Sequence, residues 1–310
     1  MRLVFFGTPD FSVATLERLH AGRHDVVAVV SQPDRRRGRG RKHTPSPVSA
    51  VAEREGLPLL RPEKVNAREV AEELRSLAPD LGVVVAYGQF LPKRIREAPA
   101  KGYLINGHAS LLPRYRGAAP IARAILEGES RTGISVMRVE REMDSGPVAL
   151  TREIAIGADE SAGELTARLA SLCADAIEEA VEQVAEDRVA WVDQAADAAT
   201  FAPKIERADA EIDFTAPASV LARLVRALAP APGAFTRLDE TALTLLEARV
   251  DPAPVDAEPG SVSRAADGTL RIATGDGWLV PVRLKRAGGK VLAVDDFLRG
   301  RPIPDGATLG

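Results

Sequence analysis

Residues 81–88, LGVVVAYG, form the most strand-like run of the chain, because nearly every side chain in it is apolar. Similar short apolar runs lie at residues 2–6, 25–30, 57–60, 103–106 and 133–139. They are separated by patterns with helical spacing at residues 11–19, 47–55 and 66–77. Apolar strands without alternation, separated by helices, are typical of a parallel sheet that is covered on both faces. We therefore predict a doubly wound α/β domain with a mainly parallel, Rossmann-like sheet.

The second half of the chain has a different pattern. A long helix is predicted at 161–187, and periodicity is then lost until a further helix at 216–229. Short strand-like runs separated by Gly or Asp follow at 234–238, 242–250, 260–265, 269–277 and 278–288. Several short strands at such spacing indicate a small β-barrel. We therefore expect a first domain at residues 1–188, a linker at 189–208 and a barrel domain at 209–310.

The composition is that of a globular protein, with 45% hydrophobic and 27% charged residues in a chain of 310. No run of about 18 apolar residues could span a membrane, and no charged-then-apolar leader precedes the first strand. The one cysteine, Cys173, excludes an intramolecular disulfide and favours the cytoplasm. No cluster of Cys and His has the spacing of metal ligands, so we expect no metal.

Positive charge is concentrated in one segment. The chain has 41 Lys and Arg residues, and six of them lie at 34–42. Without these six, 35 basic residues face 44 acidic ones, so a cationic segment stands out from an otherwise acidic chain. The six are Arg35, Arg36, Arg37, Arg39, Arg41 and Lys42. Such a run is either a solvated or localisation segment, or a loop that binds and orders on RNA phosphates. A second basic group, on a predicted barrel strand and turn, consists of Arg283, Lys285, Arg286 and Lys290; it suits salt-dependent phosphate contacts.

Asn106 and His108 lie two positions apart at the carboxyl end of one predicted strand, so both side chains point to one face. Ligands bind at this end of the strands in open α/β sheets. An amide can donate to a developing oxyanion and an imidazole can exchange a proton near neutral pH, which suits chemistry that forms a tetrahedral carbon. Turn and capping hydrogen bonds are the alternative role of such a pair. Asp144, in the turn MDSG, either pairs with His108 or only forms the turn.

The turn after the first predicted strand, in FFGTPDF at residues 5–11, contains a single glycine. A dinucleotide-binding turn needs three spaced glycines at this place, so a nicotinamide or flavin cofactor is not expected. The segment GRGRK at 38–42 is no phosphate-binding loop either, because it lacks the required spacing and the terminal Ser or Thr.

The segment NGHASLLPRYRGAAPI at residues 106–121 resembles the signature of the 10-formyltetrahydrofolate-dependent formyltransferases. Other segments are similar to those members of the family that formylate methionyl-initiator tRNA; they lie at 5–19, 32–48, 83–92, 133–148, 200–214 and 295–306. The resemblance spans nearly the whole chain. It implies transfer of the formyl group of 10-formyltetrahydrofolate to the α-amino group of methionyl-initiator tRNA, for translation initiation.

The resemblance also implies roles by position. The catalytic Asn, His and Asp of the family correspond to Asn106, His108 and Asp144. The folate site corresponds to Ser110, Leu111, Leu112 and Pro113, and to Tyr87, Gly88, Gln89, Phe90 and Leu91. The family's basic loop at the tRNA acceptor end corresponds to the segment from Arg35 to Lys42. The second domain of the family is an OB-type barrel that binds tRNA. No metal is implied, and we expect a cytoplasmic monomer.

Three positions depart from the family pattern. Gly107 replaces a usual Val between the Asn and the His, which predicts a looser strand end. Ser145 follows Asp144 in place of a usual Thr, and Ala231 lies where a Trp is common. None of these changes removes a catalytic group.

Two other functions stay open. A formyltransferase that acts on a small amine, such as an amino-sugar nucleotide or glycinamide ribonucleotide, is the nearest enzymatic alternative. The basic segment and the motifs of the second half argue against it. An RNA-binding protein with an inactive folate fold is the other, and the presence of Asn106, His108 and Asp144 together argues against that.

Overall fold

The computed structural model describes residues 1–37 and 42–310. Its internal contacts divide the chain into two compact units. The first unit contains Met1–Pro120, Arg131–Ala155 and Thr166–Ala202. The second unit contains Ile121–Ser130, Ile156–Leu165 and Pro203–Gly310, so two short segments of the first half belong to it.

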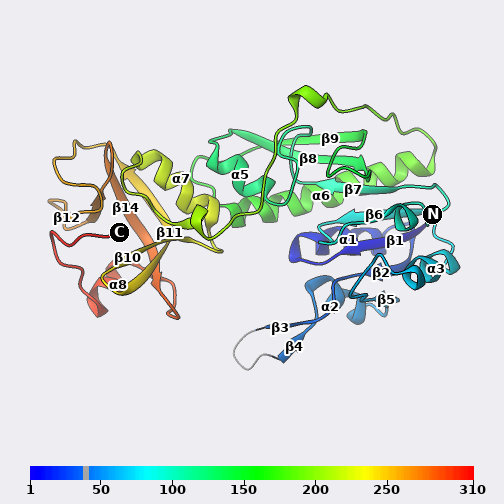
Figure 1. The fold of residues 1–310 in the computed structure, drawn as a ribbon, viewed down its shortest axis with the longest axis horizontal. Coiled ribbons are helices and arrows are strands. Elements are labelled where there is room, and N and C mark those ends of the chain that lie inside the picture. The colour runs from blue at the N-terminus through cyan, green and yellow to red at the C-terminus, as the bar shows by residue number, and fades with distance from the viewer. Residues whose placement is uncertain (38–41) are drawn as a thin grey trace. The chain divides into compact units, whose positions relative to one another are not determined.

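A seven-stranded sheet forms the centre of the first unit (Figure 1). Its strands, in spatial order, are β5 (Leu59–Leu60), β2 (Asp25–Val30), β1 (Arg2–Gly7), β6 (Leu81–Val85), β7 (Leu104–His108), β8 (Arg131–Arg138) and β9 (Val148–Ala155). The first five are parallel, and β8 and β9 are antiparallel to their neighbours. The prediction of a mainly parallel sheet is therefore confirmed. The sequence did not predict β9, an edge strand whose Thr151, Arg152 and Glu153 are exposed.

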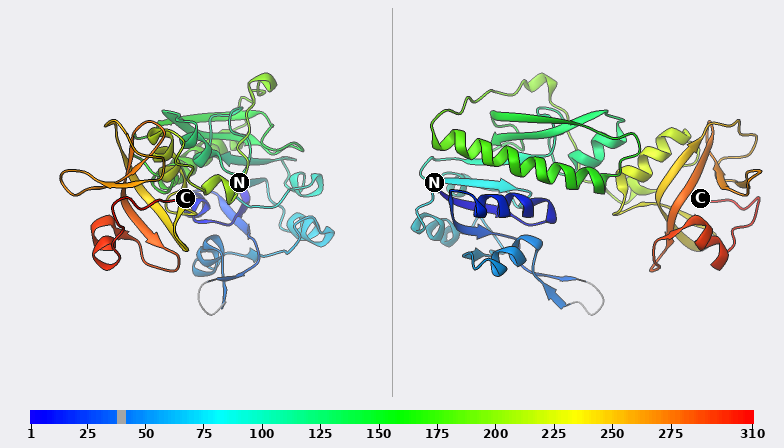
Figure 2. Two further views of the ribbon diagram at one scale, coloured as in Figure 1. Left: turned by 60° about the vertical axis from the view of Figure 1, so that its left-hand side comes forward. Right: turned by 180° about the vertical axis from the view of Figure 1, so that it is seen from behind.

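Helices cover both faces of this sheet. On one face, α3 (Arg68–Ser76) and α4 (Lys93–Arg96) pack on β1, β2 and β6 in a buried cluster that includes Val4, Phe6, Leu74 and Ile95. On the other face lie α1 (Val13–Ala21) and α6 (Ala162–Ala185), which Figure 2 shows side by side and which an ion pair between Arg18 and Glu178 connects. A 3₁₀ turn, η1 (Asp10–Ser12), precedes α1. Ser46 caps the N-terminus of α2 (Pro47–Arg54), because its hydroxyl accepts from the Ser49 N–H.

The basic segment differs from its prediction as a loop. Its two ends pair as antiparallel strands, β3 (Arg35–Arg37) and β4 (Lys42–Thr44), with Arg36 opposite His43. The sequence could not indicate this hairpin because arginines replace the apolar alternation that marks a strand. Arg39 and Arg41 lie outside the described residues.

An antiparallel sheet forms the second unit. Its strands are β10 (Ala234–Leu238), β11 (Thr241–Asp251), β14 (Trp278–Arg286), β13 (Leu270–Ala273) and β12 (Val262–Arg264) in spatial order, and β15 (Leu292–Ala293) pairs with β14. The chain end connects the two edges, because Leu309 bridges Leu238 and Thr308 bridges Ser261. The predicted small barrel is thus confirmed.

The second unit's core lies between this sheet and α7 (Ala218–Leu228), which contributes Leu221, Val225 and Leu228. The unit also contains α8 (Val294–Gly300), the 3₁₀ turn η3 (Ala208–Ala210) and most of α5 (Pro120–Leu126). A further 3₁₀ turn, η2 (Ala196–Ala198), belongs to the first unit.

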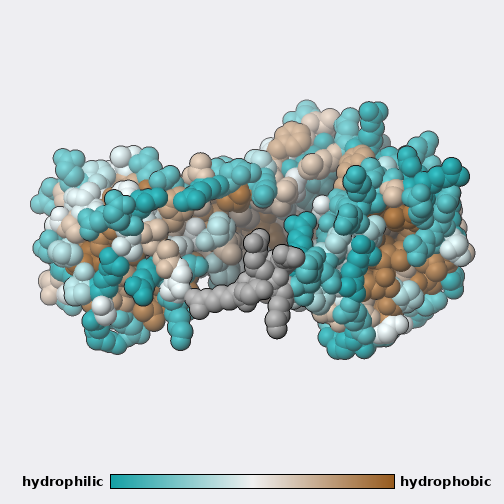
Figure 3. All heavy atoms as spheres, turned by 60° about the horizontal axis from the view of Figure 1, so that its bottom comes forward, coloured by the Kyte–Doolittle hydropathy of each residue, from teal (hydrophilic) through white to brown (hydrophobic). Residues whose placement is uncertain are grey.

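Hydrophilic residues predominate on the face shown in Figure 3. Among the large apolar side chains that are exposed are Phe90, Met143, Val192 and Phe201. Across residues 1–37 and 42–310, none of the helices combines the length and the apolarity that a membrane crossing requires.

Candidate active site

The carboxyl end of β7 carries Asn106 and His108 between two neighbouring strands. Asn106 lies opposite Val84 of β6 and Met137 of β8, and His108 lies opposite Ser135 of β8. The imidazole is buried, whereas Asn106 is partly exposed. The two functional groups therefore lie where a doubly wound sheet binds ligands.

Both ring nitrogens of His108 face oxygen atoms. Nε2 lies 2.9 Å from the carbonyl oxygen of Tyr115, which can only accept, so Nε2 carries a hydrogen and donates it. Nδ1 lies 3.6 Å from Oδ2 of Asp144, and the two side chains are 7% and 14% exposed. A second proton on Nδ1 would therefore face a carboxylate in a largely water-excluded place.

Asp144 is held by its own backbone and by a neighbouring loop. Its φ of 51° is in the left-handed region, which Asp tolerates better than most residues. Its Oδ2 accepts from the Gly117 N–H at 2.8 Å. The structure thus brings Asp144, predicted from a turn motif and the family resemblance, beside His108.

The side-chain amide of Asn106 has no hydrogen-bond partner within residues 1–37 and 42–310. Because the Asn106 side chain is partly exposed, its amide is open to solvent or to a ligand. The amide is therefore available as a donor next to the imidazole.

The loop after β7, predicted to line a folate site, is fixed by Ser135. The Ser135 hydroxyl donates to the Ser110 carbonyl at 2.8 Å and accepts from the Leu112 N–H at 3.0 Å. The Ser110 hydroxyl donates to the Arg114 carbonyl at 2.6 Å. Leu111, Leu112 and Pro113 follow as partly exposed residues on this ordered loop.

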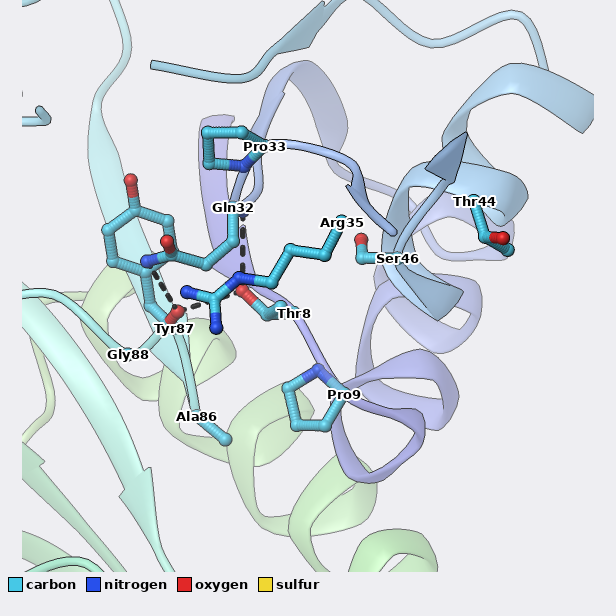
Figure 4. Close-up of a pocket in the computed structure, with 10 residues that line it drawn as sticks. All are labelled: Thr8, Pro9, Gln32, Pro33, Arg35, Thr44, Ser46, Ala86, Tyr87 and Gly88. Carbon is cyan, nitrogen blue, oxygen red and sulfur yellow. Dashed lines mark hydrogen bonds between the residues drawn. The ribbon is translucent and has the colours of Figure 1, made fainter. Parts of the chain in front are cut away.

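A cavity of about 280 Å³ opens at the carboxyl ends of β1, β2 and β6 (Figure 4). It is lined by Thr8, Pro9, Gln32, Pro33, Arg35, Thr44, Ser46, Ala86, Tyr87 and Gly88. Thr8 Oγ1 and Gln32 Nε2 donate to the Tyr87 carbonyl at 2.8 and 3.3 Å. Ala86 comes two residues after Val84, the neighbour of Asn106, so the cavity and the histidine share one edge of the sheet. The sequence did not single out Thr8, Gln32 or Ser46, since polar residues in such turns usually only shape the turn.

The predicted segment YGQFL divides between this cavity and the core. Tyr87 and Gly88 line the cavity, and burial raises the pKa of the Tyr87 phenol, whose hydroxyl has no partner within the described chain. Gln89 accepts from the Val65 N–H at 2.9 Å, and Leu91 lies in the core. Phe90 is 66% exposed.

The predicted cations lie in both units. Arg35 lies in the cavity lining, into which Figure 4 shows its side chain directed, and Arg36, Arg37 and Lys42 lie on β3 and β4. In the second unit, Arg283, Arg286 and Lys290 are exposed and Lys285 is partly exposed, on β14 and the turn after it.

Gly107 does not loosen the strand end. A Cβ atom at this position would lie 2.5 Å from Cys173 Sγ and 3.3 Å from Ile177 Cγ1, both on α6. The side chain of Cys173 thus occupies the space that a larger residue at 107 would need, and the expectation of a loose strand is wrong.

Metal ligands do not gather anywhere in residues 1–37 or 42–310: no three His, Cys, Asp or Glu side chains there could hold an ion together.

Comparison with known proteins adds to this geometry. Residues 1–181 match the family model described as formyl transferase, and residues 204–302 match the formyl transferase C-terminal domain. A methionyl-tRNA formyltransferase from Chromohalobacter salexigens is 45% identical over 317 residues, covering 100% of this chain and 97% of the relative.

Two solved structures share the fold. The methionyl-tRNA formyltransferase from Clostridium thermocellum aligns with a TM-score of 0.56 and 14% identity, covering 89% of this chain and 100% of that one. HypX from Aquifex aeolicus, solved in complex with tetrahydrofolic acid, aligns with a TM-score of 0.64 and 19% identity over 96% of this chain. This chain spans 47% of HypX, about half its length. With both family models matched and a relative of nearly equal length at this identity, the chain belongs to the formyltransferase family.

Proposed function

We propose that this protein transfers the formyl group of 10-formyltetrahydrofolate to the α-amino group of methionyl-initiator tRNA. One observation carries the proposal: a relative named for this reaction matches the chain from end to end at 45% identity. The arrangement of Asn106, His108 and Asp144 at the end of β7 supplies the groups that the reaction needs.

The reaction joins the amine to the formyl carbon. The amine must be neutral to attack, and an α-amino group titrates at about 7.7–8.0. Its nitrogen forms a bond to the formyl carbon and gives a tetrahedral intermediate with a negative oxygen. The bond from that carbon to N10 of the folate then breaks, the amine loses a proton, and N10 gains one.

Asn106 and His108 act on the oxygen of this intermediate. The free amide of Asn106 donates one hydrogen bond to it. The second donor is Nδ1 of His108, because Nε2 is already committed to Tyr115 and the 3.6 Å from Nδ1 to Asp144 Oδ2 is too long for a hydrogen bond. Donors placed where charge develops contribute most of the rate enhancement in acyl transfer, and the loss of one costs about 10²- to 10³-fold.

Asp144 orients the His108 ring. Its carboxylate lies next to Nδ1, so it stabilises positive charge on the ring. A water between the reacting amine and this carboxylate completes a path by which the amine's proton reaches N10.

The folate occupies the sheet edge beside these groups. Ser110, Leu111, Leu112 and Pro113 form one wall, which Ser135 holds in place. Tyr87 and Gly88 border the cavity on the other side of β7, and Gln89, Phe90 and Leu91 continue that segment. HypX, which shares this fold, was solved in complex with tetrahydrofolic acid, and that complex supports a folate site here.

Cations of both units contact the acceptor arm of the tRNA. Arg35 reaches the cavity, which favours a place near the end of the acceptor strand. Arg36, Arg37, Arg39, Arg41 and Lys42 continue the basic segment, and Arg283, Lys285, Arg286 and Lys290 provide the second contact. Phosphate contacts of this kind supply salt-dependent affinity.

The domains act as a catalytic part at residues 1–188, a linker at 189–208 and a tRNA-binding part at 209–310. The enzyme works as a monomer in the cytoplasm, where translation uses its product. Sedimentation of the purified protein tests the monomer, and a dimer would overturn it.

The acceptor is tested by supplying labelled 10-formyltetrahydrofolate with charged initiator tRNA, an amino-sugar nucleotide or glycinamide ribonucleotide. We expect label on the tRNA and none on the small amines. Label on a small amine, with none on tRNA, would overturn the assignment.

A further inference from the structure

The chain between the two matched segments contacts the site directly. Residues 191–202, here called the strap, lie between the family matches at 1–181 and 204–302. We propose that Gln194 of the strap is a positioning residue that sets Asp144 against His108. The proposal rests on the proposed formyl transfer at His108.

The strap belongs to the first unit, and both of its ends are bonded to other segments of that unit. At its start, Val192 and Val148 of β9 exchange two backbone hydrogen bonds, of 2.8 and 2.9 Å. Trp191 stacks on the Arg138 guanidinium, which also lies 4.0 Å above the Tyr103 ring. At its end, Ala202 donates to the Arg116 carbonyl at 2.7 Å. The strap therefore runs from the edge of the sheet to the loop after β7.

Gln194 connects the two loops that orient His108. Its Nε2 donates to the carbonyls of Asp144 and Gly146, at 2.9 and 2.7 Å. Its Oε1 accepts from Nε and Nη2 of Arg116, at 3.1 and 2.7 Å. Both donors and both acceptor sites of one amide are thus used, and Arg116 is only 9% exposed.

Thr200 holds the loop at residues 110–117. Its Oγ1 accepts from the Tyr115 N–H at 2.9 Å, and its own N–H donates to the Pro113 carbonyl at 3.3 Å. Tyr115 has a φ of 59°, a conformation that non-glycine residues adopt only when their surroundings fix it. The Tyr115 carbonyl is the acceptor of His108 Nε2, so Thr200 fixes the backbone that orients the ring.

These contacts explain how two separate loops hold Asp144 at a fixed position relative to His108. His108 receives its Nε2 partner from the loop at 110–117 and its Nδ1 partner from the turn between β8 and β9. Gln194 bonds to Arg116 on the first and to Asp144 on the second. If Gln194 is lost, the distance between Asp144 and His108 is no longer fixed, and a misplacement of about 1 Å can cost 10²-fold in rate.

The test compares Gln194→Glu and Gln194→Ala with a neighbouring control. A glutamate still accepts from Arg116 but cannot donate to the two carbonyls. Gln194→Glu should therefore lower kcat at least as much as Gln194→Ala. We expect kcat to fall about 10- to 100-fold, with little change in KM for folate or tRNA. Asp193→Asn is the control, because Asp193 is exposed and its side chain makes no hydrogen bond or ion pair within the described residues. It should keep wild-type kcat.

A double-mutant cycle separates positioning from general destabilisation. In an Asp144→Asn background, the loss caused by Gln194→Ala should shrink to less than about twofold, because the residue it positions is already disabled. Thr200→Ser should keep most of the activity and Thr200→Val should not, which gives a second readout if Gln194 variants fold poorly.

The outcomes are distinguishable. Wild-type protein that fails to formylate tRNA in this assay contradicts the proposed function. Active wild-type protein with unchanged kcat in both Gln194 variants, or with fully additive losses in the cycle, overturns the role of Gln194.

Discussion

His108 Nδ1 lies 3.6 Å from Asp144 Oδ2, while the opposite nitrogen of the same ring donates to the Tyr115 carbonyl at 2.9 Å. The ring cannot rotate without breaking the second contact. Nδ1 is therefore held beside the Asp144 carboxylate, and the unbonded amide of Asn106 lies two residues before His108 on the same strand.

Asn106→Ala should lower kcat about 10²- to 10³-fold, because it removes one donor to the oxyanion. The amide has no hydrogen-bond partner within the described chain, so the melting temperature should stay close to wild type. Steady-state kinetics with both substrates, together with a thermal melt, checks this. A variant that raises KM alone would place Asn106 in binding and not in the chemical step.

Gly107→Ala should destabilise the protein by about 1–3 kcal/mol, the usual cost of overpacking. Its Cβ would lie 2.5 Å from Cys173 Sγ, and in the double variant with Cys173→Ala that atom is gone, so the two losses should not add. Urea denaturation of the two single variants and the double variant measures the coupling.

Gly300→Ala is the matched control for this cycle, because a Cβ there meets nothing within 4 Å. It should change stability little. Additive losses for Gly107→Ala and Cys173→Ala would contradict the close packing of β7 on α6.

Burial raises the pKa of the Cys173 thiol to about 12. An unfolded cysteine titrates near 8.5, so between roughly pH 9 and 12 the unfolded state loses a proton that the folded state keeps. The contribution of the neutral thiol to the free energy of unfolding is complete below that pH window. It is lost as pH rises through the window, by up to about 1.4 kcal/mol per pH unit. Urea denaturation at pH 8 and 10.5 should show wild type losing more stability than Cys173→Ala. Equal losses would contradict the buried, neutral thiol.

Arg283→Ala and Arg286→Ala should each raise KM for tRNA and leave KM for folate unchanged. If each arginine neutralises one phosphate, the slope of log affinity against log salt should fall by about 1 per variant. Titrations of tRNA at several salt concentrations measure the slope. Arg68→Ala is the control, since Arg68 is an exposed arginine of the first unit that pairs with Glu72. A slope unchanged by the β14 variants would remove this surface from the tRNA site.

The sequence predicted the elements that depend on apolar patterning. Runs such as LGVVV and VVAVV are apolar throughout because helices cover both faces of the strands, and that burial leaves a clear signal. The edge strand β9 and the hairpin of β3 and β4 carry charged side chains. Their pairing depends on backbone hydrogen bonds, which leave no hydrophobic pattern in the sequence.

The sequence likewise predicted part of the candidate site. Asn106 and His108 follow from their place on a buried strand, and Asp144 from a turn motif and a family resemblance. The strap was predicted only as a linker, since Gln194 and Thr200 act through single contacts to backbone atoms and to Arg116. Contacts between segments this far apart in the chain have no periodicity to detect.

In the proposed reaction, formyl transfer to methionyl-initiator tRNA depends above all on His108. The most direct test is single-turnover transfer from 10-formyltetrahydrofolate to the charged tRNA, wild type beside His108→Ala, with folate binding measured for both. We expect rapid transfer by the wild type and a loss of more than about 10²-fold in the variant, with folate binding retained. Transfer by the variant at the wild-type rate would contradict the role given to His108. A wild type that binds folate but does not transfer to the tRNA would contradict the acceptor.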